Sequence, residues 1–143
     1  MKKKIWVILA LAGFVFASIT IGQEEEQGKP APEKSQLKAE IAVICKNVDR
    51  EKRQPVEPGD KFPADVGRLY CFTKIAGAEK ETEIKHLWYH GDNLLATVTL
   101  PVKSSSWRTW SSKAIEKTRK GEWKVEIKDA EDKLITTLYF IIE

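Results

Sequence analysis

Two histidines, His86 and His90, are the side chains best suited to acid–base or metal chemistry, and they share one face of a predicted strand. Four strand residues span about 13 Å, whereas a shared zinc ion would need both rings at Zn–N distances of about 2 Å. Beyond the cysteines no third ligand is evident, so the pattern predicts no metal site and no cofactor. We expect His86 within or beside the core and His90 exposed at a hairpin.

Nucleophilic chemistry would need a serine beside a base and an acid. None of the clustered serines lies in a Gly-x-Ser-x-Gly turn, and the chain has no glycine-rich phosphate loop. We therefore predict that the protein is not an enzyme. A hydrolase with a site near His86 or His90 is the less favoured alternative. The serines in question are Ser104, Ser105, Ser106, Ser111 and Ser112.

A basic and aromatic stretch, residues 107–113, holds the remaining candidate residues. If it is extended, Trp107 and Thr109 face one way and Arg108 and Trp110 the other. One interpretation is an exposed patch that binds an anionic or glycan partner, with contacts from Arg108, Trp110 and Lys113. The alternative is an intramolecular clamp, in which one tryptophan fills the core and the polar side chains bond to nearby backbone.

The chain has two cysteines, Cys45 and Cys71, on two predicted strands. In an exported protein an even cysteine count at strand positions predicts a structural disulfide. Two buried free thiols that pack as small hydrophobic groups are the alternative.

The N-terminus predicts export. Lys2 to Lys4 precede an apolar run over residues 5–16 that ends in small residues, which is typical of a signal peptide over residues 1–22. An uncleaved membrane anchor is the alternative, and it would be the protein's only contact with a membrane. We expect a periplasmic or secreted protein, or else one anchored in the inner membrane and facing the periplasm.

Charge argues against nucleic acid as a partner. Three of the 24 basic residues lie in the targeting segment, which leaves 21 beside 21 acidic residues. A nucleic-acid binder needs an excess of cations. Residues 23–36 are polar and contain several prolines and glutamates, and we interpret them as a flexible linker.

Residues 37–143 read as one all-β domain. Short β-branched and aromatic runs alternate with turns, and Gly91-Asp92-Asn93 is a hairpin signal. Residues 50–63 contain three prolines and predict a loop or an edge, and only residues 112–120 have the capping pattern of a short helix. The pattern predicts an Ig-like antiparallel β-sandwich.

The motifs from residue 69 to residue 129 resemble a bacterial family called domain of unknown function 2914. They are Leu-Tyr-Cys-Phe-Thr-Lys-Ile (69–75), Ile-Lys-His-Leu-Trp-Tyr-His (84–90), Trp-Arg-Thr-Trp-Ser-Ser-Lys (107–113) and Gly-Glu-Trp-Lys-Val-Glu-Ile-Lys-Asp (121–129). The resemblance implies an envelope protein and implies no activity. We therefore expect an exported, non-catalytic module that binds an envelope protein or glycan, with a purely structural envelope domain as the alternative.

Overall fold

The computed structural model describes residues 33–143, so the predicted targeting segment and most of the predicted linker lie outside the described residues. Within that range the chain forms nine strands and no helix. No helix of this part is long and apolar enough to cross a membrane. The strands are β1 (Lys38–Asp49), β2 (Gln54–Gly59), β3 (Lys61–Phe62), β4 (Arg68–Ala76), β5 (Thr82–His90), β6 (Asn93–Val102), β7 (Ser106–Ala114), β8 (Gly121–Asp129) and β9 (Leu134–Ile142).

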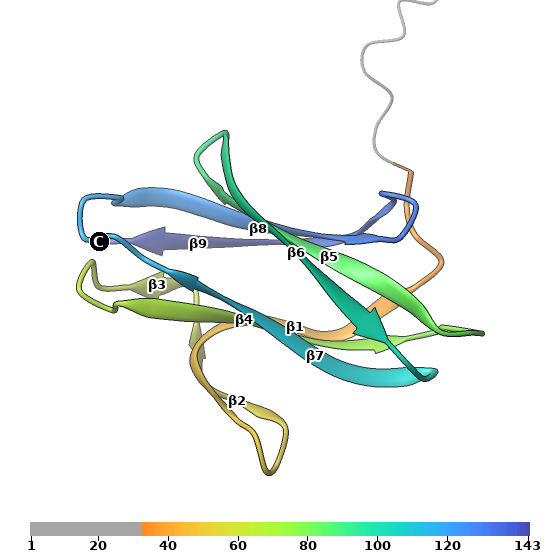
Figure 1. Ribbon diagram of the computed structural model, residues 1–143. Helices are drawn as coiled ribbons and strands as arrows, with labels where there is room; N and C mark the ends of the chain where they lie inside the picture. The colour runs from red at the N-terminus through yellow and green to blue at the C-terminus, as the bar shows by residue number, and fades with distance from the viewer. Residues whose placement is uncertain (1–32) are drawn as a thin grey trace, which may run out of the picture. The chain divides into compact units, whose positions relative to one another are not determined.

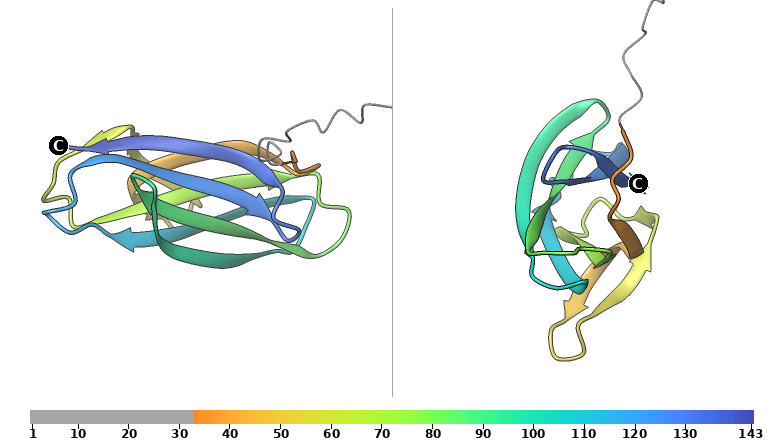
Figure 2. Two further views of the ribbon diagram at one scale, coloured as in Figure 1. Left: turned by 90° about the horizontal axis from the view of Figure 1, so that it is seen from above. Right: turned by 90° about the vertical axis from the view of Figure 1, so that its right-hand side faces the viewer.

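The strands form two sheets that pack face to face as a sandwich (Figures 1 and 2). One sheet has four strands in the order β2-β1-β4-β7, and the other has five in the order β3-β9-β8-β5-β6. All strand pairs are antiparallel except β3 with β9. The all-β sandwich predicted from the alternating pattern is confirmed.

The core lies between the two sheets and follows from strand alternation. On β8, Trp123, Val125 and Ile127 are buried while the lysines and glutamates between them face solvent. Trp88 of β5 and Phe140 of β9 are buried beside them. The ring of Phe140 stacks on Trp123 at 5.8 Å and meets Trp88 edge-on at 6.2 Å. Aromatic pairing of this kind adds to the stabilisation that burial provides.

Hairpins and edges largely follow the turn signals. Gly91 has a φ of 55° and joins β5 to β6, as the glycine signal predicts. Residues 50–63, predicted to be a loop or edge, form a turn and the strands β2 and β3. β2 is an edge strand, where prolines are tolerated because no ladder hydrogen bond is lost on the free side. The hairpin of β1 and β2 projects from the sandwich (Figure 1).

The helix predicted over residues 112–120 does not form. β7 runs to Ala114, where it is still paired with Arg68 of β4, and residues 115–120 are a loop. Nine consecutive cross-strand pairs with β4 outweigh a capping pattern of barely two turns, because short helices are marginal without tertiary support.

The predicted disulfide between Cys45 and Cys71 is not formed, and both residues are buried free thiols. The register explains this. Ile44 lies opposite Cys71, so Cys45, the next residue, points to the other face of the sheet. Cys71 packs in the core between the sheets, whereas Cys45 packs with Phe72 on the outer face. Burial raises the pKa of both thiols.

The folded part extends slightly further toward the N-terminus than the predicted domain start at residue 37. Leu134 of β9 donates its N–H to the carbonyl of Glu33, and Ser35 donates to the carbonyl of Leu134. The last residues of the predicted linker are therefore hydrogen-bonded to β9.

Candidate functional site

A fully buried polar cluster joins the two sheets. His86 of β5 is 0% exposed, and its two ring nitrogens face hydroxyl groups of the opposite sheet. Nδ1 lies 2.7 Å from the Ser111 hydroxyl of β7, and Nε2 lies 3.4 Å from the Thr73 hydroxyl of β4. The indole of Trp88 also donates to Ser111, at 3.1 Å.

The directions of the hydrogen bonds in this cluster follow from the number of donors and acceptors that each side chain has. Thr73 donates its hydroxyl to the carbonyl of Thr109 at 2.9 Å, so it has no hydrogen left for the imidazole. His86 Nε2 therefore carries the proton and donates to Thr73, which leaves Nδ1 as an acceptor. Ser111 donates to Nδ1 and accepts from Trp88. The chain of donors runs in one direction, from the Trp88 indole to the Thr109 carbonyl.

The imidazole in this cluster is neutral. Burial lowers the pKa of His86 to about 3, because the charged form would lose its hydration without gaining a counter-ion. Ser111 and His86 have the spacing of a nucleophile and its base. Both are buried, however, and neither makes a hydrogen bond to a carboxylate within residues 33–143. These hydrogen bonds join β5 to β4 and β7, and we call the cluster the inter-sheet clamp.

The second histidine lies elsewhere. His90 Nε2 lies 2.7 Å from the Lys120 carbonyl oxygen, and the ring centroid of His90 lies 4.9 Å from that of Trp123. Because a carbonyl only accepts, the ring nitrogen is the donor. In the described part of the chain no three metal-ligating side chains lie together.

The predicted alternation along β7 is confirmed. Trp107 packs against the core between the sheets, and Thr109 lies buried on the same side. Arg108 and Trp110 face outward, where Trp110 stacks on Phe72 with ring centroids 5.9 Å apart. The structure thus keeps Arg108 and Trp110 on one face, as predicted.

Lys113 does not join that pair. Side chains alternate between the two faces of a strand, and Lys113 is five residues after Arg108 and three after Trp110. Its side chain therefore lies on the opposite face of β7. Its ammonium group donates to the carbonyl of Ala114 at 3.2 Å. The three predicted contact residues are therefore not one patch.

Arg53, which the sequence did not indicate as a site residue, contacts both Trp107 and Arg108 of β7. It is the last residue of the β1–β2 turn, with a φ of 52°, and donates from its guanidinium to the carbonyl of Arg108 at 2.7 Å. The guanidinium also lies 5.3 Å from the ring centroid of Trp107. The contact joins residues 55 positions apart, and no local motif indicates it. The cation–π contact with Trp107 thus comes from a hairpin that is distant in the sequence.

A pocket of about 210 Å³ opens where β7 and the end of β6 meet. We call it the β7 pocket; its lining residues are Arg53, Pro101, Lys103, Trp107, Arg108, Thr109 and Trp110. It brings together three cations and two indoles, and none of these cations forms an ion pair with an acid among residues 33–143. Nε of Arg108 is buried and has no hydrogen-bond partner among the residues that the structure describes. The pocket therefore carries uncompensated positive charge beside aromatic surface.

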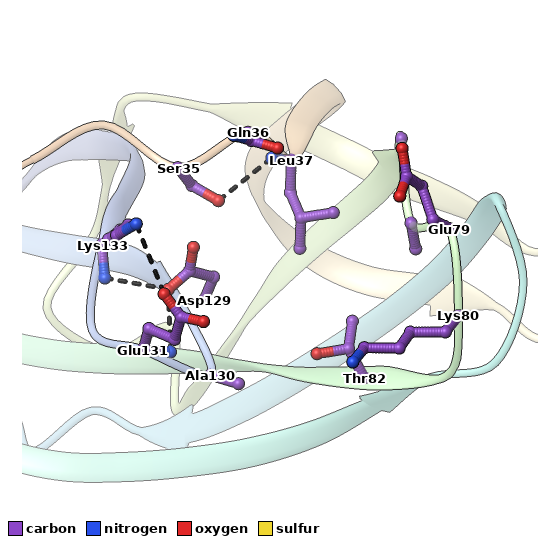
Figure 3. Close-up of a pocket in the computed structure, with 12 residues that line it drawn as sticks. Ser35, Gln36, Leu37, Glu79, Lys80, Thr82, Asp129, Ala130, Glu131 and Lys133 are labelled. Carbon is purple, nitrogen blue, oxygen red and sulfur yellow. Dashed lines mark hydrogen bonds and ion pairs between the residues drawn. The ribbon is translucent and has the colours of Figure 1, made fainter.

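A second pocket, of about 560 Å³, lies at the end of the sandwich where residues 35–37 pass the β8–β9 turn (Figure 3). Its charged residues carry both signs, and Lys133 lies 3.3 Å from Glu131. Burial alone would raise the pKa of Asp129, but hydrogen bonds from Ser35 and from turn N–H groups hold that pKa below its usual value. Acidic residues and lysines both line this pocket, whereas every charged residue that lines the β7 pocket is a cation.

The fold and the site define a small β-sandwich with a buried inter-sheet clamp and a basic, aromatic edge pocket. Residues 81–142 match the model of a protein family of unknown function, DUF2914. The resemblance predicted from the tryptophan motifs is confirmed over those residues, and the motif at residues 69–75 lies outside the match. None of the curated proteins matches the chain.

Proposed function

We propose that the protein is an exported, non-catalytic binding module whose β7 pocket holds an anionic group of an envelope protein or glycan. The observation that carries this proposal is the gathering of Arg53, Lys103 and Arg108 around two indoles, with no ion pair to an acid of residues 33–143. Like charges held together repel one another, so a site of this kind gains stability when an anion enters it.

The chemistry of the lining fits an anion presented by a larger molecule. A guanidinium can bind a carboxylate, sulfate or phosphate group through two parallel hydrogen bonds. The indoles of Trp107 and Trp110 supply flat apolar surface beside it, which suits a sugar ring or an aliphatic side chain. Export and residence in the envelope, as a periplasmic, secreted or membrane-anchored protein, are part of the proposal and rest on residues 1–22.

The test compares wild type with the double variant Lys103→Ala and Arg108→Ala. Tagged full-length protein is crosslinked in the cells that produce it, and the captured molecules are identified by mass spectrometry. We expect the double variant to lose capture, because it removes two of three cations from the pocket. Lys113→Ala is the matched control, since this lysine is on β7 but outside the pocket, and it should retain capture.

A purely structural role is the second candidate, and the Arg53 contact favours it. Arg53 already bonds to the Arg108 carbonyl and covers Trp107, as an intramolecular clamp would. If this role is the whole function, wild type captures no partner and the double variant differs only in its unfolding free energy. Near-UV circular dichroism of the tryptophans shows whether each variant is folded. Capture that persists in a folded double variant would contradict the β7 pocket as the binding site.

A further inference from the structure

A continuous row of side chains crosses the outer face of the five-stranded sheet. Leu94 of β6 pairs with Tyr89 of β5, Tyr89 with Lys124 of β8, and Lys124 with Tyr139 of β9. Paired residues point to the same face, and the neighbours Trp88, Trp123 and Phe140 are buried inside. The row therefore faces solvent across four strands.

This face is unusually apolar for an exposed surface. The described part of the chain exposes four large hydrophobic side chains, and three of them, Leu94 (50%), Tyr139 (72%) and Ile141 (38%), lie here. Ile141 pairs with Glu122 and is next to Tyr139 on the same side of β9. Exposed apolar side chains that gather on one face, rather than scattering singly, mark an interaction surface.

The charges on this face alternate along the central strand β8. Glu122, Lys124, Glu126 and Lys128 all point outward. Within the chain Lys124 lies 3.2 Å and Lys128 lies 3.5 Å from the carboxylate of Glu126. If a second copy of this row is laid over the first in the antiparallel direction, each charge lies opposite a charge of the other sign. This property restricts which partner fits the face.

We propose that the outer face of the β3-β9-β8-β5-β6 sheet docks against the same face of a second copy of this chain. In a two-fold arrangement with the axis across β8 at Val125, the two β8 strands run antiparallel. Lys124 then faces Glu126 of the second copy, and Glu122 faces Lys128 of the second copy. Each of these four charged residues on β8 meets a residue of opposite charge.

The alternative two-fold, with its axis along β8, places each residue opposite its own copy. Glu122 would meet Glu122, and Lys124 would meet Lys124, which costs free energy at each contact. Charge therefore selects the antiparallel arrangement. In it Tyr89 packs opposite Leu87 of the second copy, so apolar contacts provide affinity and the ion pairs provide register.

The test uses charge reversals on full-length protein in mild detergent, with dimer affinity measured by analytical ultracentrifugation. Lys124→Glu places two glutamates opposite each other at both symmetric contacts and should weaken the dimer at least tenfold. Glu126→Lys places two lysines there and should do the same. The double variant Lys124→Glu with Glu126→Lys restores both pairs and should recover the wild-type affinity.

A mixture of the two single variants separates this interface from effects inside one chain. Each variant alone has a disturbed ion pair on β8, but in the mixed dimer every intermolecular contact is again between opposite charges. We expect differently tagged single variants to capture each other and not themselves. A monomeric wild type would overturn the proposal, and so would single variants that dimerise as wild type does or fail to recover on mixing. Capture of a different protein by this face, with wild type monomeric, would also overturn it.

Discussion

At the scale of single residues, His86 makes stability depend on pH. Its pKa is 6.5 in the unfolded chain and falls to about 3 when the fold buries it. Below pH 6.5 the unfolded chain therefore binds a proton that the folded chain does not, and the folded state loses stability as pH falls toward 3. Above pH 6.5 this contribution is complete. The loss amounts to about 1.4 kcal/mol for each pH unit within that window.

The measurement is the urea unfolding free energy at several pH values, combined with NMR titration of the two imidazoles. We expect the His86 resonances to stay unchanged between pH 8 and pH 5. A His86 signal that titrates near pH 6.5 in the folded protein contradicts the buried, neutral assignment.

Ser111 is the residue on which the inter-sheet clamp depends most. Its hydroxyl donates to His86 and accepts from Trp88, so Ser111→Ala leaves one buried acceptor and one buried donor without partners. Each such group costs about 1–3 kcal/mol, and we expect a loss of roughly 3 kcal/mol in unfolding free energy. Ser112→Ala is the matched control.

Ser112 is the next residue, but it faces outward and bonds to an exposed arginine, Arg68. Its replacement should change stability by about 0.5 kcal/mol or less, as exposed substitutions usually do. Chemical denaturation of both variants provides the comparison. Equal stabilities would mean that the buried hydrogen bonds of Ser111 contribute little.

At the scale of elements, Arg53 is expected to hold the β1–β2 hairpin against β7. Arg53→Ala removes a charged hydrogen bond to the Arg108 carbonyl and the contact with the Trp107 ring. We expect a loss of about 1–2 kcal/mol. We also expect faster amide hydrogen exchange in residues 46–59, because the hairpin has few other contacts with the sandwich. Lys52→Ala, one residue earlier in the same turn, should change neither.

The elements also show what a sequence can and cannot predict. The alternation of apolar and charged residues along β8 predicts a strand and which of its side chains are buried. The glycine after β5 predicts a turn. Both signals are local in the sequence. The pairing of β7 with β4 is not local, and it overrides the capping pattern at residues 112–120.

The candidate site was only partly predictable for the same reason. Arg108 and Trp110 share a face because they are two residues apart on one strand, and strand periodicity fixes that. Arg53 reaches Arg108 across 55 positions, and His86 reaches Ser111 across 25. Contacts of this length depend on how the sheets stack. The separation of Cys45 from Cys71 likewise depends on a register that cysteine spacing does not reveal.

At the scale of the whole molecule, the family match and the folding unit have different boundaries. The match covers residues 81–142, which supply β5 to β9. The opposite sheet consists of β2, β1, β4 and β7, so all its strands except β7 precede the matched stretch. β4 is the only sheet neighbour of β7, and it carries Thr73 of the inter-sheet clamp.

A fragment of residues 81–142 should therefore not fold alone. The four strands that it keeps of the five-stranded sheet would expose the inner faces of Trp88, Trp123 and Phe140 to water, and Ser111 would be on a strand without a partner. We expect it to lack near-UV circular dichroism and a cooperative urea transition, whereas residues 33–143 should show both. Adding residues 33–80 as a separate chain should recover part of the signal, since these residues supply β1, β2, β3 and β4. Cooperative unfolding of the isolated fragment would show that the second sheet is dispensable, and the inter-sheet core would then not be what stabilises this protein.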